Sequence, residues 1–284
     1  MDGMTLALAL GATISWSSTW VLMRAGIKEM DRTAFGLLRP WFGLLFIIPF
    51  AWATQGFQFG SPLLILIALA SGFLNAYVGV AFFYYALTHG SMHESNILAG
   101  TNPFWAALSA IVVLGEPARW EALIAALLIV AGTYFLAQRG PNDKRAHGIA
   151  PTLAALGAGI LWGFTVAVPS KYCLTQGMSP IGYQLVFTVS GALAWTVAAM
   201  PKLMRRQLTF SRKGVWIAFA SAFSGLFLGW VLWLVAMRSA PASALAPLNG
   251  LTLLFAVLLG AAIFRERLTA RIILGGALCS RASP

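Results

Sequence analysis

Residues Leu10–Trp16 read LGATISW, and residues Leu156–Trp162 read LGAGILW, so that five of the seven letters return 146 positions later. Coherent matches at both ends of a segment indicate an internal duplication. We therefore predict two repeats, residues 1–140 and 141–284, within one membrane domain. Further matched pairs are Gly36 with Gly182 at the same offset, and Ala86 with Ala236 and Glu116 with Glu266 at an offset of 150.

The composition excludes a soluble domain. The 284 residues are 59% hydrophobic and 10% charged, whereas soluble domains average about 45–50% apolar and about 25% charged residues. A membrane-spanning helix needs roughly 20 apolar residues. Reading for that length gives spans near 5–23, 33–53, 62–87, 92–114, 119–138, 149–168, 180–201, 214–237, 241–264 and 268–280, of which the last is short.

Two five-helix repeats have an odd number of spans each, so the second copy enters the membrane upside down. The expected fold is therefore an all-α integral membrane protein with ten transmembrane helices in two inverted five-helix repeats. If the loops after spans one, three, five, seven and nine lie on one side, that side holds 15 of the 19 lysine and arginine residues. Because positive charge stays in the cytoplasm, we predict a multi-pass protein of the bacterial inner membrane with both termini outside the cytoplasm.

The net charge of +11 would suggest nucleic acid as a partner in a soluble protein. Here the charges stand in small groups between apolar runs, so we read them as topology signals that face anionic lipid. No nucleic-acid partner is expected. The expected partners are membrane lipid and a small-molecule substrate, with the protein as a monomer.

The two halves resemble the EamA type of the drug/metabolite transporter superfamily, and within it the exporters of amino acids, notably aromatic ones. The resemblance lies in LGATISW and LGAGILW, followed by NPFWAALSAIVVLGEP and NGLTLLFAVLLGAAIFRERLT. It implies a central cavity and export of small metabolites, and inverted repeats suit alternating access around a site at the midplane. One departure is Pro103, whose matched position holds Leu253.

The candidate substrate-binding residues come from the matched positions. Trp16 and Trp162 either anchor and pack their helices or form paired walls of an aromatic cavity. Helical spacing places Ser95, Ala99, Asn102 and Ala106 on one stripe. The matched stripe is Leu245, Asn249, Thr252 and Ala256. Such small and amide residues either join helices or face a wet cavity.

Aromatic pairs in spans three and eight complete the candidate site. Tyr77 and Tyr84 are seven residues apart on one face, and Trp230 and Trp233 share another, which suits core packing as well as a cavity wall. Ser91 and Glu94 form a capping box for span four. The neighbouring His93 is the alternative, at the mouth of the cavity, as a ligand of a carboxylate or a carrier of a proton.

None of the eight carboxylates lies at the middle of a span, which disfavours proton-coupled export of organic cations. We therefore expect a secondary transporter of neutral or zwitterionic metabolites, with other metabolites or drugs as the alternative cargo. A membrane-embedded enzyme is the alternative from another class, but no catalytic set, metal cluster or phosphate-binding loop stands out. We expect no enzymatic activity, no metal and no cofactor. Glu116 and Glu266 each follow a helix end, which suits capping of the next helix.

Overall fold

The computed structural model describes residues 1–90, 92–117, 124 and 148–264, and all of its regular structure there is helical. Seven helices are long and apolar enough to cross a membrane: Gly3–Glu29, Arg32–Ala53, Pro62–His89, Ser95–Leu114, Ile149–Thr175, Pro180–Met204 and Arg212–Ser239. A further apolar helix begins at Ala242. The expected span at 119–138, apart from residue 124, and the expected span at 268–280 lie outside the described residues. The all-α membrane fold is thus confirmed.

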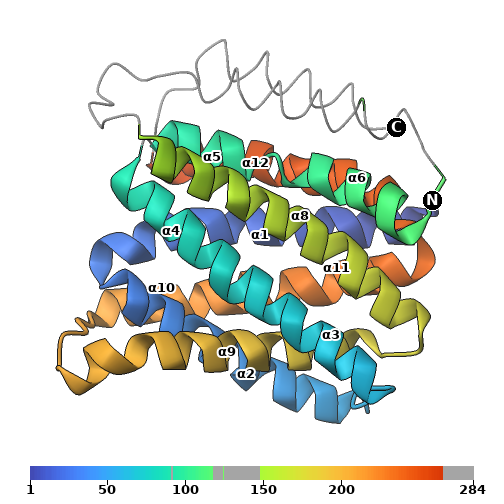
Figure 1. The fold of residues 1–284 in the computed structure, drawn as a ribbon, viewed down its shortest axis with the longest axis horizontal. Coiled ribbons are helices and arrows are strands. Elements are labelled where there is room, and N and C mark those ends of the chain that lie inside the picture. The colour runs from blue at the N-terminus through green and yellow to red at the C-terminus, as the bar shows by residue number, and fades with distance from the viewer. Residues whose placement is uncertain (91, 118–123, 125–147, 265–284) are drawn as a thin grey trace. The chain divides into compact units, whose positions relative to one another are not determined.

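The chain divides into two compact units, each built from segments of both expected repeats. The first consists of Met1–Tyr77 and Pro169–Arg238, and the second of Val78–Val168 and Ser239–Pro284. In the first unit the elements are α1 (Gly3–Glu29), α2 (Arg32–Ala53), α3 (Pro62–Gly72), most of the π-helix η1 (Phe73–Gly79), the end of α8 (Ile149–Thr175), α9 (Pro180–Met204), α10 (Arg212–Ser221), the π-helix η2 (Ala222–Gly229) and α11 (Trp230–Ser239). Within this unit α2 and α9 lie side by side (Figure 1).

In the second unit the described elements are α4 (Val80–His89), α5 (Met92–Ala99), α6 (Asn102–Leu114), the first part of α8 and α12 (Ala242–Phe264). Helices α6 and α12, the fourth spans of the two repeats, pack against each other (Figure 1). One uninterrupted span over 92–114 was expected, but α5 ends at Ala99 and α6 begins at Asn102. Pro103 lacks an N–H, and the Thr101 hydroxyl donates to the Leu98 carbonyl at 2.7 Å, so the backbone turns at this point.

Equivalent segments of the two expected repeats show the same local structure. Helix α8 begins and ends 146 positions after α1. The expected third and eighth spans each contain a π-helical segment, and an offset of 150 places Phe73–Gly79 on Phe223–Gly229. The pattern of buried, intermediate and exposed side chains over 61–90 returns over 211–240 with differences at two positions. A continuous α-helix over 62–87 was expected, and the π segment is the correction.

Polar residues at the helix starts explain where several helices begin. The Asp31 carboxylate accepts from the N–H groups of Thr33 and Ala34 at the start of α2, and the Ser179 hydroxyl accepts from the N–H of Gly182 in α9. Such caps satisfy N–H groups that have no partner within the helix. Helix α6 ends at Leu114 and is followed by Gly115, whose φ of 66° is left-handed and favours glycine.

Candidate functional site

The repeated motif places Trp16 in an aromatic cluster of the first unit. Its ring centroid lies 5.7 Å from that of Trp230, at an interplanar angle of 75°, and 5.2 Å from that of Trp233. Phe187 of α9 continues the cluster at 4.6 Å from Trp230. Edge-to-face and tilted ring pairs of this kind are attractive. Trp16 and Trp230 are thus brought together, on a largely buried face of α1 and α11.

The indole N–H of Trp16 bonds to the backbone of the π segment η2. It donates to the Gly225 carbonyl at 3.2 Å, and the Ser15 hydroxyl donates to the Ser224 carbonyl at 2.7 Å. One turn later, the Thr19 hydroxyl meets the Ser224 hydroxyl at 2.7 Å. Ser15 and Trp16 of the first motif therefore supply partners for a helix whose wide turns depart from regular α-helical bonding.

The second copy of the motif lies in the second unit and packs in the same way. The ring of Trp162 lies 5.2 Å from that of Phe83, at 60°. Phe83 occupies the position that Trp233 holds in the other repeat, at an offset of 150. Each motif tryptophan thus packs on the third helix of the opposite repeat, at the equivalent residue.

Two glycines beside Trp162 allow α8 to approach the break between α5 and α6. A Cβ atom on Gly163 would lie 2.3 Å from the Asn102 carbonyl oxygen, and one on Gly159 would lie 2.7 Å from that of Leu98. Small residues permit such close backbone contact between membrane helices. The second motif therefore packs against the discontinuous helix.

The stripes on α6 and α12 meet through a chain of buried neutral polar groups. The Asn249 amide donates to the Asn102 amide oxygen at 3.2 Å, and Asn102 in turn donates to the Ala99 carbonyl at 3.3 Å. The Thr252 hydroxyl donates to the Asn249 amide oxygen at 3.4 Å. Ser95, at the other end of its stripe, is buried with a relative exposure of 2%. The expected stripes thus lie between helices, and three of their polar members are joined.

The remaining sequence candidates fall in different places. Tyr77 lies in η1, where its ring is 5.2 Å from that of Trp195 at 85°. Tyr84 is buried in α4, and the π turn between them changes the register that the seven-residue spacing assumed. The His93 and Glu94 side chains lie outside the described part of the structure, as does Ser91, so the capping box and the role of His93 stay predictions.

Gln184 and Trp195 of α9 were not anticipated. Both are buried, and each donates a hydrogen bond to a carbonyl of a π segment, Gln184 to Leu226 and Trp195 to Ala76. The available sequence signal was a glutamine within an apolar run, because an amide side chain inside a membrane helix needs a hydrogen-bond partner.

Glu116 caps a helix, but a different one from the helix expected. Its carboxylate accepts from the N–H groups of Ala242 and Ser243, both at 2.8 Å, and from the Ser243 hydroxyl at 2.6 Å. These groups form the start of α12, not of the next helix in the chain. Negative charge at a helix N-terminus is favourable, so Glu116 ties the end of α6 to the start of its partner. Glu266, its match, lies outside the described residues.

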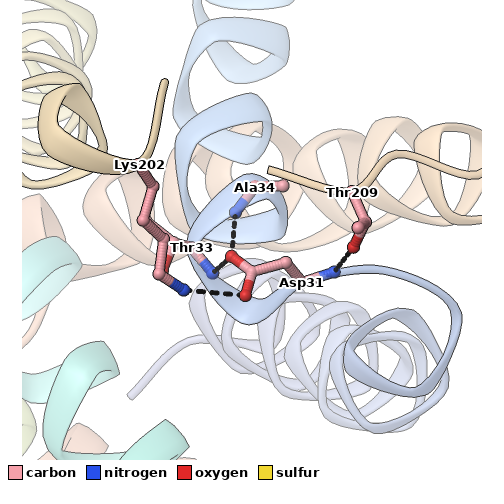
Figure 2. A network of polar contacts seen from close by, with 5 residues as sticks. All are labelled: Asp31, Thr33, Ala34, Lys202 and Thr209. Carbon is pink, nitrogen blue, oxygen red and sulfur yellow. Dashed lines mark hydrogen bonds and ion pairs between the residues drawn. The ribbon is translucent and has the colours of Figure 1, made fainter. Parts of the chain in front are cut away.

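A charged network holds one end of the first unit together (Figure 2). Lys202 at the end of α9 lies 2.8 Å from the Asp31 carboxylate, and Thr209 accepts from the Asp31 N–H at 3.2 Å. Burial opposes ionisation of Asp31, but the hydrogen bond and charge of Lys202 and the N–H groups of the α2 start outweigh it. The pKa of this carboxyl is therefore held below its ordinary value.

The opposite end of the first unit is joined by uncharged contacts. The Ser179 hydroxyl donates to the Gly56 carbonyl at 2.6 Å, and its N–H donates to the Gln58 carbonyl at 2.9 Å. The contacts of Asp31 with Lys202 and Thr209 therefore place the basic loops after spans one and seven at the same end of this unit.

One correction concerns Arg39, which was counted with the loop charges but is buried within α2.

Across the residues that the structure describes, no three His, Cys, Asp or Glu side chains converge on a metal site. The model of the EamA-like transporter family matches residues 3–138 and again residues 150–280. The chain belongs to the EamA-like transporter family. This membership confirms a multi-pass membrane transporter, with a small-molecule substrate and a lipid environment.

Two further comparisons agree with the membership. An "Uncharacterized transporter" of Archaeoglobus fulgidus is 20% identical over 271 residues, which cover 95% of this chain and 93% of that protein. A solved crystal structure superposes with a TM-score of 0.82 at 15% identity, over 100% of this chain and 96% of that one. The second likeness shows the fold of this EamA-like protein, and the first shows a transporter of similar length.

Proposed function

We propose that this EamA-like protein is a secondary transporter that exports small neutral or zwitterionic metabolites, with amino acids, including aromatic ones, as the substrate class. The observation that carries the proposal is the buried chain of neutral polar groups formed by Asn102, Asn249 and Thr252 in the second unit. The carboxylates whose side chains are described, Asp2, Glu29, Asp31 and Glu116, all stand at helix ends. A charge-neutral polar site favours a solute without net charge.

The amides have hydrogen-bonding capacity that the described contacts leave unused. Each asparagine nitrogen carries two hydrogens, and the contacts described above use one on Asn102 and one on Asn249. An amide hydrogen can bond a carboxylate, and an amide or hydroxyl oxygen can accept from an ammonium group. The same three residues therefore suit both ends of a zwitterion without adding net charge.

Aromatic residues would receive the apolar part of the solute. Trp16 and Trp230 offer ring faces in the first unit, and Trp162 does so in the second. Indole faces suit aromatic and branched side chains. Tyr77, Tyr84, His93 and Ser95 complete the proposed site.

The repeats support alternating access. The family model matches twice, α1 and α8 have corresponding bounds, and both third helices carry a π segment at the same place. We place the second copy inverted relative to the first. When the two inverted copies exchange conformations, the site opens to one side of the membrane and then to the other. We also place both termini on the non-cytoplasmic side of a bacterial inner membrane, and the protein acts as a monomer.

Proteoliposomes loaded with a labelled amino acid test the proposed site. Asn102→Ala removes a buried hydrogen-bonding group worth about 1–3 kcal/mol, so transport should fall about 5- to 150-fold. Trp162→Ala should also lower transport because it removes an aromatic face. Ser109→Ala, two turns further along α6 and bonded only to Ala106 in the described contacts, should leave the rate unchanged, as should Cys173→Ala. Normal transport in both site variants, across the whole amino-acid panel, would remove these residues from the site.

A further inference from the structure

Both π segments depart from regular helical bonding inside the membrane. In a π-helix the backbone bonds run from i to i+5, and where this pattern replaces the i to i+4 bonds of the adjoining α-helix, carbonyl groups are left that can accept a further bond. The bilayer core offers no water, so their donors must come from other side chains. The segments η1 and η2 therefore depend on donors from neighbouring helices.

One helix, α9, supplies a donor to the same carbonyl position in both segments. The Trp195 indole N–H donates to the Ala76 carbonyl at 2.8 Å, and the Gln184 amide donates to the Leu226 carbonyl. Ala76 and Leu226 are equivalent residues of the two repeats, at an offset of 150. All of these contacts lie within the first unit, so α9 bonds to the equivalent residue of each π segment.

Helix α2, the counterpart of α9 in the first repeat, does not carry the two donors. At the offset of 146 it carries Leu38 and Pro49 where α9 carries Gln184 and Trp195. Neither side chain can donate a hydrogen bond. The repeat symmetry is therefore broken at these two positions, and among the described contacts α9 is the helix that donates to the equivalent carbonyl of both segments.

The contacts of both side chains fix their positions. Gln184 is fully buried, and its amide nitrogen also donates to the Thr188 hydroxyl at 3.3 Å. The Trp195 ring packs on Gly36, where a Cβ atom would lie 2.6 Å from the indole. The two donors are separated by about 16 Å of helix at 1.5 Å per residue. A displacement of one segment can thus be transmitted along α9 to the other.

We propose that α9 couples the two π segments, with Gln184 and Trp195 as positioning residues that make both third helices change together during transport. This inference rests on the proposed function, because it assigns the coupling to the transport cycle. The segments η1 and η2 act as the deformable parts, and α9 prevents one from changing without the other. The two residues set the rate of turnover and leave substrate affinity unchanged.

Hydrogen exchange tests the coupling without any substrate. In detergent-solubilised protein, Trp195→Phe keeps a ring but removes the N–H that bonds η1. Amide exchange should rise about tenfold, as expected for the loss of one buried hydrogen bond, in residues 73–79 and also in residues 222–229. Gln184→Leu should raise exchange in the same two segments. A rise confined to the segment that loses its own bond would overturn the coupling.

Trp41→Phe provides a matched control. Its indole N–H also donates to a residue of α9, the Thr196 hydroxyl, at 3.0 Å. This bond does not involve a π segment. Exchange in both segments should stay at the wild-type level in this variant. A similar rise in the control would show general loosening of α9 and contradict the proposal.

Transport kinetics of the same variants give the second measurement. Each single variant should lower the maximal rate about tenfold, with the half-saturating concentration unchanged, and the double variant should be no slower than the slower single one. Multiplied effects in the double variant, or a raised half-saturating concentration, would contradict a common coupling. If wild-type protein moves no solute of the panel, the proposed function fails, whereas the exchange experiment still decides the coupling.

Discussion

Removal of the Glu116 carboxylate should destabilise the pairing of α6 with α12. Three hydrogen bonds of 2.6–2.8 Å join it to Ala242 and Ser243. Loss of a helix cap costs about 0.5–2 kcal/mol, and loss of negative charge at a helix N-terminus adds about 0.3–1 kcal/mol. We therefore expect Glu116→Ala to lower the free energy of unfolding by about 2–3 kcal/mol, the upper part of that combined range.

A graded series tests this magnitude by equilibrium unfolding in mixed detergent micelles, followed by circular dichroism. Glu116→Gln keeps one acceptor oxygen and should lose about 1 kcal/mol. Ser243→Ala removes only the hydroxyl bond and should lose about 0.5–1.5 kcal/mol. Glu29→Gln is the control, because its partner Lys213 is largely exposed and such surface pairs contribute about 0–1 kcal/mol. If Glu116→Ala lost no more free energy of unfolding than the control, the Glu116 cap would not stabilise the protein and the reasoning would be refuted.

Three further predictions concern other parts of the structure. Because the pKa of Asp31 is lowered in the folded state, its stabilising contribution is complete above the ordinary aspartate value of about 3.9 and is lost as the pH falls through its folded pKa. Lys202→Met raises the folded pKa towards that ordinary value, so in thermal unfolding scans from pH 3 to 7 the stability lost on acidification should be smaller and its loss should be complete at a higher pH. Gly163→Ala should destabilise by about 1–3 kcal/mol because the added methyl group meets a backbone oxygen. In intact cells without native cysteines, an impermeant thiol reagent should label Gly60→Cys and leave Arg206→Cys unlabelled.

Each of these has its own control or contrary result. Lys213→Met, at the exposed pair, should leave the pH dependence of stability unchanged. If this variant changed the pH dependence as Lys202→Met does, Asp31 would not be the group responsible. Gly157→Ala should be milder than Gly163→Ala, since its Cβ atom would meet a movable Phe82 ring at 3.1 Å. Labelling of the Arg206 position and not of the Gly60 position would show that the topology is the reverse of the predicted one.

Sequence periodicity predicted features that depend on local composition. The apolar runs located the described spans, and helical spacing placed Asn102 and Asn249 on two matched stripes that either join helices or face a wet cavity. Helix α1 extends beyond its expected span of 5–23 to Gly3–Glu29, because polar residues at its end remain helical where hydropathy has already fallen. Local signals therefore place helices well and their ends less well.

Features that depend on distant partners could not be predicted. The π segments read as ordinary apolar helix, and their bonding involves Gln184 and Trp195, more than 40 residues away along the chain. Glu116 was expected to cap its sequence neighbour, and its actual target follows from the packing of α6 against α12. In each case a tertiary contact, invisible in local sequence, decides which group receives the bond.

The central claim, that this EamA-like protein moves small solutes without net charge, is tested most directly by counterflow in proteoliposomes. Purified wild-type protein would be assayed against a panel of neutral, acidic and basic amino acids and an organic cation, with and without a pH gradient. We predict counterflow of neutral and aromatic amino acids that needs no pH gradient, because no described carboxylate lies within the middle of a span. Accumulation of the organic cation alone, driven by the pH gradient, would contradict the account.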